Sequence, residues 1–237
     1  MRMRNWLVGL ATLALVAGTP ALVQGQVERG DWTLALQGGP VLYAEASAIE
    51  RGTGVAVEAM YHITPRFAIG PIADFIHSKT DGRYFIGVLN FGPDSTHIYE
   101  VGQTINVLQY GAAAMLDLMP ESNISPYLAA GAGGYTIYLQ PTSNDMAKRT
   151  HGMMFQAGGG VRFGLSDATA IQLDVRDLIY TDFDREELNP VRPAHRNRQP
   201  DGTIRFPGAE YPDLPEATST VHNFRVSIGF RYIPGRN

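Results

Sequence analysis

The chain has 237 residues, a net charge of −4 at neutral pH and no cysteine. This length suits one large β-domain. The missing cysteines exclude disulfides and thiolate metal ligands, and the acidic balance argues against a nucleic-acid partner. The only lysines are Lys79 and Lys148, and both fall between predicted strands. A water-exposed sheet surface normally carries lysines, so their absence from the strands favours a polar face that lines an enclosed interior.

Residues 1–25 predict a cleavable secretory signal peptide. Arg2 and Arg4 precede an apolar core from Trp6 to Ala17, and Pro20 breaks that core. The core is too short to span a bilayer comfortably, and small residues at its end, such as Gly25, suit cleavage. The alternative is a retained N-terminal anchor. The mature domain is therefore expected over residues 26–237.

Eight strand-like runs follow the signal, and no amphipathic helix separates them, which excludes parallel βαβ units. Most runs are longer than the usual strand of a globular protein and suit a tilted membrane crossing. The predicted strands are Trp32–Tyr43, Gly54–Ile63, Phe67–His77, Ile105–Met119, Tyr127–Leu139, Gly152–Leu165, Thr169–Tyr180 and Val221–Ile233.

Residues 151–180 show the strand pattern most clearly, with apolar and polar residues alternating on both sides of a tight turn at 166–168. This turn keeps the two apolar sets on one face of the hairpin. It also places Arg162 diagonally across from Asp174, within reach of a cross-strand ion pair. The predicted cross-strand neighbours are Val161 with Leu173, Phe163 with Ile171, and Arg162 with Gln172.

The connections between the strands alternate in length. Short turns are predicted at 64–66, 120–124 and 166–168, and longer loops at 44–53, 78–104, 140–151 and 181–220. This asymmetry is typical of outer-membrane barrels, in which the short turns are periplasmic. Long segments without secondary structure are often functional, so loops 78–104 and 181–220 are where an extracellular ligand would bind if the protein recognises one.

Aromatic residues eight positions apart recur on the apolar face of four strands. Eight residues of a tilted strand rise roughly 20 Å along the barrel axis, close to the ~25 Å lipid-facing band between the aromatic girdles of a membrane barrel. This spacing predicts that the apolar face is outside, and that two girdles are formed by Phe67, Phe75, Tyr127, Tyr135, Phe155, Phe163, Phe224 and Tyr232.

The polar face then lines a narrow lumen. An eight-stranded barrel has an interior that side chains can just fill. Four acids and four arginines occupy the alternate positions, so the set is balanced, and leaving any of them unpaired would incur a large desolvation cost. We expect a closed ion-pair network formed by Glu58, Asp74, Asp117, Arg162, Asp174, Arg176, Arg225 and Arg231.

The strand Ile124–Tyr135, the hairpin at 151–180 and the final strand Phe224–Tyr232 resemble the small eight-stranded outer-membrane barrels typified by the OmpA transmembrane domain and OmpX. The resemblance covers nearly all of residues 26–237. It implies an all-β, eight-stranded antiparallel transmembrane barrel with up-and-down meander order, in a Gram-negative-type outer membrane. Two features depart from the family: the chain continues past Tyr232, and no periplasmic peptidoglycan-binding domain is expected.

Three functions are compatible with such a barrel. We expect a non-enzymatic, monomeric barrel among outer-membrane lipids and lipopolysaccharide, with a charge-paired lumen and long extracellular loops for structural or surface-interaction roles. The alternatives are a narrow channel for ions or small hydrophobic solutes, as in barrels that resemble OmpW, and a lipid A-modifying enzyme. No His-x-Ser pair lies on a strand, and the acidic run at 182–187 lacks the spacing of a calcium loop. Catalytic, cofactor-binding and metal-ligating residues are therefore not predicted.

Overall fold

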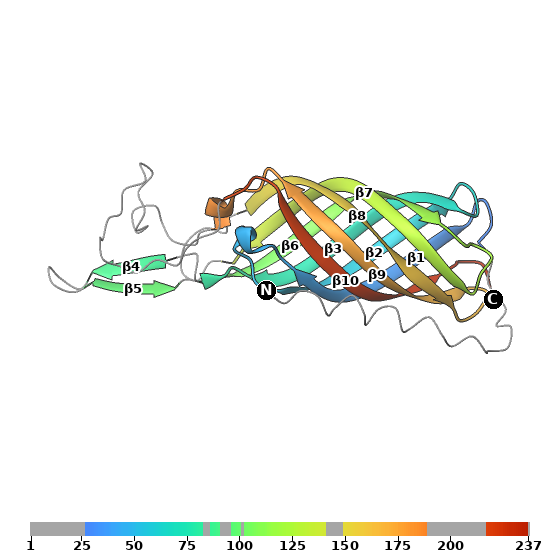
Figure 1. The fold of residues 1–237 in the computed structure, drawn as a ribbon, viewed down its shortest axis with the longest axis horizontal. Coiled ribbons are helices and arrows are strands. Elements are labelled where there is room, and N and C mark those ends of the chain that lie inside the picture. The colour runs from blue at the N-terminus through green and yellow to red at the C-terminus, as the bar shows by residue number, and fades with distance from the viewer. Residues whose placement is uncertain are drawn as a thin grey trace, which may run out of the picture.

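The computed structural model describes residues 27–82, 86–90, 96–100, 102–140, 149–188 and 217–236. Eight antiparallel strands form a closed barrel in which sequential barrel strands pair and the last pairs with the first (Figure 1). The predicted fold class, strand number and meander order are confirmed. The signal peptide predicted over residues 1–25 lies outside the described residues. The barrel strands are β1 (Trp32–Leu42), β2 (Gly52–His62), β3 (Phe67–Lys79), β6 (Thr104–Asp117), β7 (Ile124–Leu139), β8 (Arg149–Gly164), β9 (Thr169–Thr181) and β10 (Val221–Tyr232).

The loop predicted over 78–104 contains a small sheet of its own. Strands β4 (Ile86–Asn90) and β5 (Thr96–Glu100) pair antiparallel and project beyond one end of the barrel (Figure 1). The sequence pattern does not reveal this pair, because each strand has only five residues and lies in a segment without clear alternation. The barrel itself continues directly from β3 to β6, which pair along their whole length.

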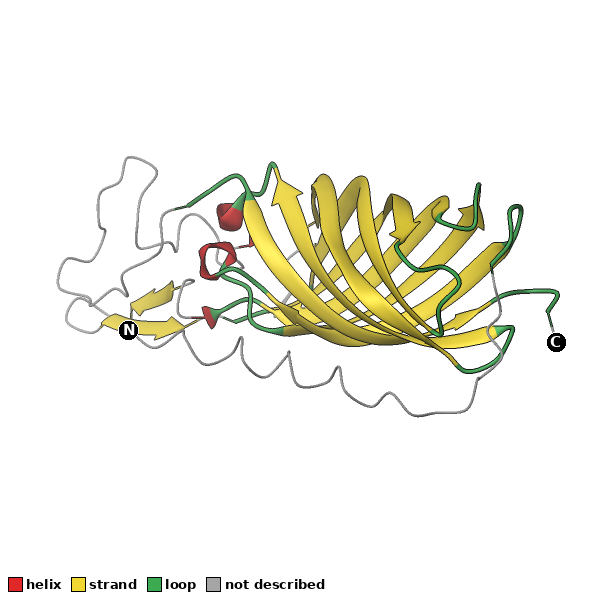
Figure 2. Ribbon diagram, turned by 45° about the vertical axis from the view of Figure 1, so that its right-hand side comes forward, coloured by secondary structure: helices red, strands yellow, loops and turns green. Residues whose placement is uncertain are grey.

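The connections divide the barrel into two different ends (Figure 2). The short-turn end carries the turns at 63–66, 118–123 and 165–168, and the long-loop end carries the other connections. At the short-turn end, the amide of Leu165 donates to the carbonyl of Thr169 at 2.9 Å and closes the predicted turn. The 3-10 helices η2 (Glu45–Ser47) and η4 (Arg185–Leu188) lie at the long-loop end. Within the described residues, no helix has the length and apolar character needed to cross a membrane.

The hairpin of β8 and β9 has the predicted register. Val161 pairs with Leu173, Phe163 with Ile171, and Arg162 with Gln172. Since side chains alternate between the two faces of a strand, this register places Val161, Phe163, Ile171 and Leu173 on one face. The sequence pattern therefore determined both the pairing and the faces of this hairpin correctly.

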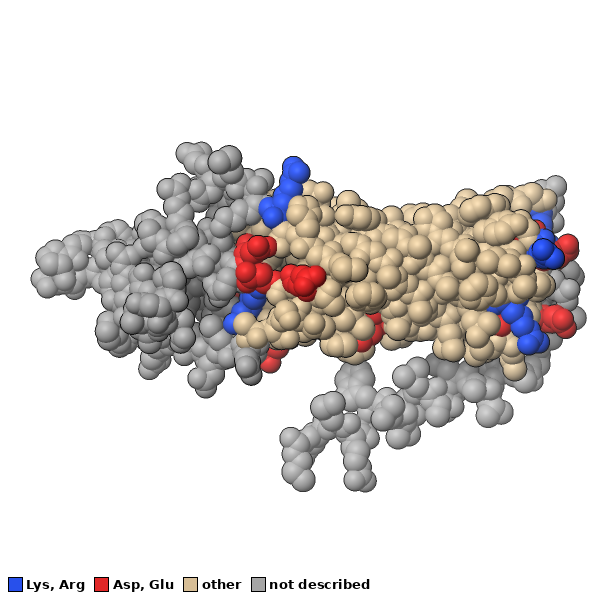
Figure 3. Space-filling view, turned by 90° about the horizontal axis from the view of Figure 1, so that it is seen from above, with Lys and Arg blue, Asp and Glu red and all other residues tan. Residues whose placement is uncertain are grey.

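The outward face of the barrel is largely apolar. On β1, Leu34 and Leu36 are 44% and 57% exposed, whereas the intervening Ala35 and Gln37 are buried in the interior. On the surface seen in Figure 3, charged side chains gather mainly near the two ends of the barrel. An apolar band between polar ends matches the hydrocarbon layer of a membrane. The predicted outward direction of the apolar face is thus confirmed.

The interior is not polar along its whole length, contrary to the sequence-based expectation. Near the long-loop end, inward-facing side chains form an apolar cluster, and Ala48, Ile49, Phe183 and Leu188 from the adjoining loops pack with it. The expectation fails there because the strand ends carry consecutive apolar residues, such as Leu178, Ile179 and Tyr180, instead of alternating ones. The strand residues of the cluster are Val41, Ile76, Ile105, Val107, Tyr135, Ile137, Leu139, Met154, Leu178, Tyr180 and Val221.

Candidate functional site

The candidate site is the polar part of the barrel interior, between the apolar cluster and the short-turn end. It contains all eight charged residues that the alternation assigned to the lumen. Each of them is at most 8% exposed. They project from six strands: Glu58 from β2, Asp74 from β3, Asp117 from β6, Arg162 from β8, Asp174 and Arg176 from β9, and Arg225 and Arg231 from β10.

Five of these residues form a central ionic cluster. Arg176 Nη1 lies 2.5 Å from Glu58 Oε1, and Arg176 Nε lies 3.0 Å from Asp174 Oδ1. Arg225 forms an ion pair with Asp74, and its Nη2 is 3.9 Å from Asp174 Oδ1. Two arginines therefore meet three carboxylates, which leaves the central cluster with a formal excess of one negative charge. Arg176 is the hub, because it joins β2 to β9 across the barrel.

The remaining three charged residues lie closer to the short-turn end. Arg162 forms an ion pair with Asp117, and its guanidinium carbon lies 4.2 Å from the ring centroid of Tyr127. The predicted contact of Arg162 with Asp174 is wrong, because Asp174 is engaged by Arg176 and by the hydroxyl of Tyr127. Arg231 Nη2 is 3.5 Å from Nε2 of His62, and within the described chain no carboxylate forms an ion pair with Arg231. This second group therefore has a formal excess of one positive charge.

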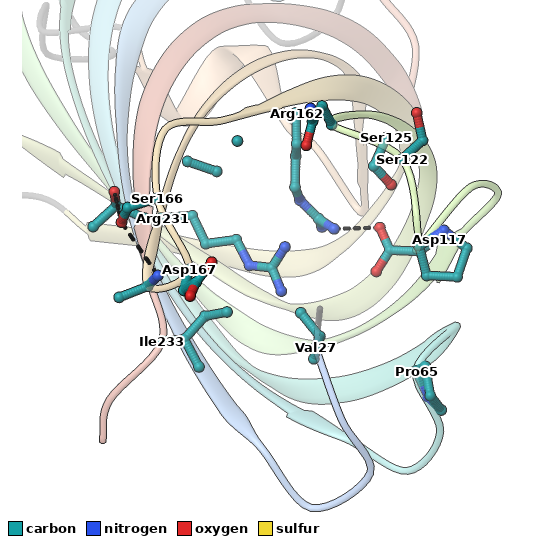
Figure 4. Close-up of a pocket in the computed structure, with 16 residues that line it drawn as sticks. Val27, Pro65, Asp117, Ser122, Ser125, Arg162, Ser166, Asp167, Arg231 and Ile233 are labelled. Carbon is teal, nitrogen blue, oxygen red and sulfur yellow. Dashed lines mark hydrogen bonds and ion pairs between the residues drawn. The ribbon is translucent and has the colours of Figure 1, made fainter. Parts of the chain in front are cut away.

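A cavity of about 40 Å³ adjoins this second group at the short-turn end (Figure 4). Arg162 and Arg231 extend into it from different sides, and Val27 and Ile233 form part of its apolar wall. A second void of about 10 Å³ lies within the central cluster. A buried water needs roughly 10–15 Å³, so these spaces have room for about three waters and one water respectively.

Two tyrosines expected in the outward girdles are instead part of the interior. Tyr127 and Tyr135 are each 1% exposed. Tyr127 donates a hydrogen bond to Asp174 Oδ2 at 2.7 Å, and Tyr135 stacks on Tyr180 with ring centroids 4.4 Å apart. The expectation was wrong because β7 carries small residues on both faces, so its alternation does not reveal the direction. Each ring has room because its cross-strand partner is a glycine, Gly160 or Gly152.

The other six predicted girdle residues project from the outward face. Phe67, Phe75, Phe155, Phe224 and Tyr232 are 37–51% exposed, and Phe163 is half-buried beside outward-facing neighbours. Three strands thus keep the eight-residue aromatic spacing. Their position at the two lipid–water interfaces remains a prediction.

Uncharged polar residues also lie in the interior, and two of them, Gln37 and Asn223, were not assigned to it from the sequence. Gln37 Oε1 accepts a hydrogen bond from Ser227 at 2.9 Å, and Gln109 Nε2 donates to the hydroxyl of Tyr180 at 2.5 Å. Asn223 joins β10 to the loop after β1, because its Oδ1 accepts from the amide of Ala44 at 3.1 Å. The two-residue alternation of the strands could have identified them, because each lies at an inward-facing position of its strand.

The histidines do not complete a catalytic triad within the described residues. His222 Nδ1 lies 2.7 Å from Asp177 Oδ2, and His151 Nδ1 lies 2.9 Å from the hydroxyl of Thr136. The carboxylate and the hydroxyl are therefore held by different histidines. Ser78, next to His77 in sequence, points its hydroxyl inward to the carbonyl of Glu50. In the described part of the chain, no group of three metal-binding side chains comes together.

Comparison with known proteins places this architecture in a family. Residues 9–194 match the model of the outer membrane protein beta-barrel domain. The structure resembles Neisserial surface protein A with a TM-score of 0.51, 12% identity, and coverage of 85% of this chain and 96% of that chain. Two further structures resemble it more weakly: OprG of Pseudomonas aeruginosa (TM-score 0.47, 10% identity, 89% and 99% coverage) and Ail of Yersinia pestis (TM-score 0.43, 11% identity, 87% and 100% coverage).

The two kinds of comparison have different weight. At these identities the structural likeness shows the fold alone, and no curated protein matches the chain. The family model, in contrast, spans most of the sequence. The closed eight-stranded meander and the apolar outward band agree with that match. The chain belongs to the outer membrane protein beta-barrel family.

Proposed function

We propose that this outer-membrane protein is a closed, non-enzymatic, monomeric barrel that displays its long loops at the cell surface for structural or interaction roles. The filled interior carries this proposal. Its central part is occupied by the ion pairs around Arg176, and the part toward the long-loop end is occupied by the apolar cluster. A barrel filled in this way acts as a rigid scaffold for its loops.

Two physical barriers oppose conduction through this interior. An ion crossing the central cluster would have to separate buried ion pairs, such as Arg176 with Glu58, and their charges would lose their partners. The same ion would then meet the apolar cluster, in which Ile76, Ile137 and Leu178 are completely buried. Dehydrating an ion among apolar side chains is costly. The central ionic cluster and the apolar cluster together therefore support a non-conducting barrel better than a channel.

The proposed surface role rests on the asymmetry of the two ends. Short turns of outer-membrane barrels face the periplasm and long loops face outward, so β4, β5, η2 and η4 would lie on the extracellular side. Near this end, Arg149 lies over the ring of Tyr138 at 5.4 Å. The positive charge of Arg149, held beside the outward-facing ring of Tyr138, could bind the phosphate groups of lipopolysaccharide. Most of the proposed ligand-binding loop 181–220 lies outside the described residues.

A planar-bilayer recording tests the closed state against the channel alternative. We expect purified, refolded protein to give no reproducible conductance steps above the detergent control. Refolding is checked beforehand by the different migration of unheated and boiled samples on a gel. Stable steps of uniform size from the unmodified protein would contradict the closed barrel and favour a narrow channel.

Lipid A analysis tests the non-enzymatic part of the proposal. Lipid A is extracted from cells with and without the protein and compared by mass spectrometry. We expect identical spectra, because no histidine whose side chain the structure describes contacts both a carboxylate and a hydroxyl. The variant His222→Ala serves as the control. A mass change that depends on the protein and disappears in this variant would establish an enzyme.

A further inference from the structure

The cavity at the short-turn end contains a positive charge that lacks a counter-charge in contact. Arg231 is 8% exposed, and its Nε has no hydrogen-bond partner among the described residues. In the same part of the chain, its Nη2 contacts only Nε2 of His62, at 3.5 Å. Arg162 brings a second guanidinium to the same cavity, and the carboxylate of Asp117 is engaged with Arg162. Of these two guanidiniums, only that of Arg162 is in ion-pair contact with a carboxylate of the described chain.

Other hydrogen-bond donors face the same space without a protein acceptor. Ser125 is 7% exposed, and no described residue forms a hydrogen bond with its hydroxyl. Nε of Arg162 is likewise unpartnered. These donors come from β7 and β8, while Arg231 comes from β10, so three strands direct donors toward one cavity (Figure 4). Val27 and Ile233, which are both buried, form part of the apolar wall of this cavity.

A buried guanidinium without an acceptor is costly, and an oxyanion is the ligand that compensates it best. The planar fork of arginine matches the oxygen spacing of carboxylate and phosphate groups, and charge-assisted hydrogen bonds of this kind are strong. The volume of about 40 Å³ accommodates a small anion in place of water. We infer that this cavity is a binding site for one small free oxyanion, of which inorganic phosphate is the probe, held by Arg231 and Ser125.

Asp167 controls the affinity of this site. It belongs to the turn between β8 and β9, its side chain lines the cavity, and its Oδ1 has no hydrogen-bond partner. A negative charge at this position opposes a bound anion and also offers Arg231 an alternative partner across the cavity. Neutralising Asp167 therefore distinguishes two possibilities. In one, Arg231 binds an external anion; in the other, Arg231 and Asp167 form an ion pair with each other inside the cavity.

The experiment measures phosphate binding to refolded protein in zwitterionic micelles. The unfolding midpoint in urea is followed against phosphate concentration, with ionic strength held constant by sodium chloride, and the affinity is measured by calorimetry. We expect saturable stabilisation of the unmodified protein. Binding is expected to weaken at least roughly tenfold in Arg231→Gln, and measurably in Ser125→Ala, because each removes a donor. Asp167→Asn is expected to bind several-fold more tightly.

Arg66→Gln is the matched control, because Arg66 is an exposed arginine of a turn at the same end and does not line the cavity. Phosphate binding in this variant should equal that of the unmodified protein. If Arg231→Gln does not refold, Ser125→Ala and Asp167→Asn still decide the result. Absence of saturable binding in both the unmodified protein and Asp167→Asn would overturn the proposal and assign the cavity to water. Loss of stability in Asp167→Asn without phosphate binding would also overturn it, in favour of an Arg231–Asp167 pair.

Lipid nanodiscs distinguish a free anion from a lipid phosphate. Protein in discs of phosphatidylcholine should bind inorganic phosphate as it does in micelles. The same affinity in discs that contain phosphatidylglycerol supports a free anion inside the cavity. Competition by phosphatidylglycerol would show that an anionic headgroup reaches Arg231, and would overturn the assignment to a free oxyanion.

Discussion

Replacing Arg176 with methionine is expected to lower the free energy of unfolding by about 3–5 kcal/mol. Arg176 is 1% exposed and contacts both Glu58 and Asp174. Its removal leaves two buried carboxylates with fewer counter-charges in a cluster that already has more acids than arginines. Arg225 cannot compensate for both, because it is paired with Asp74. The measurement is the urea midpoint of the refolded barrel in micelles, read from the unheated gel band.

Two companion variants show whether the effect comes from the unpaired charge. Arg66→Met removes an exposed arginine and should change the midpoint little, because an exposed charge contributes little to stability. Adding Glu58→Gln to Arg176→Met should recover part of the loss, because it removes the carboxylate whose ion pair with Arg176 is broken. An unchanged midpoint in Arg176→Met itself would mean that water screens these charges and that the interior is not a closed ionic cluster.

Alanine at Gly160 is expected to destabilise the barrel by about 3 kcal/mol, in the upper part of the range for overpacked interiors. A Cβ at this inward position would collide with the backbone carbonyl of Leu173 and would lie 2.8 Å from the hydroxyl of Tyr127. Relief requires β8 and β9 to separate and Tyr127 to move, and movement of Tyr127 breaks its hydrogen bond to Asp174. The urea midpoint and the tyrosine fluorescence of the folded protein together measure this change.

Gly38→Ala is the matched control for the glycine prediction. Gly38 lies on the outward face of β1, where a Cβ would approach the carbonyl of Gly54 at an ordinary 3.6 Å. This variant should unfold close to the unmodified protein. Equal midpoints for Gly160→Ala and Gly38→Ala would mean that the interior has free space beside Tyr127, contrary to the close approach in the structure.

Several features of the fold could be predicted from the sequence because they depend on local chemistry. A strand places successive side chains on opposite faces, so the alternation in residues 151–180 determined both faces and the register of the hairpin. The number of strands followed from counting such runs between turn residues. The buried placement of the eight charged residues followed from the same two-residue period.

The partners of those charged residues could not be obtained in the same way. Arg162 pairs with Asp117, which is 45 positions away in the sequence. Arg176 on β9 pairs with Glu58 on β2. These contacts depend on how far neighbouring strands shift when the sheet closes, and the shift is a property of the whole barrel. The unequal division of charge between the two groups, and hence the position of Arg231 beside the cavity, follow from the same closure.

The sequence by itself determined that this chain forms a barrel with an apolar exterior, because the side-chain period of a strand is local and repeats in nearly every segment. Only the tertiary structure decided which positions depart from the alternation of apolar outward and polar inward side chains. Tyr127 and Tyr135 turn inward because glycines on β8 leave space for their rings, and the apolar cluster fills the long-loop end because residues from distant loops pack against it. Such packing depends on volumes contributed by several strands, and one strand's pattern does not contain that information.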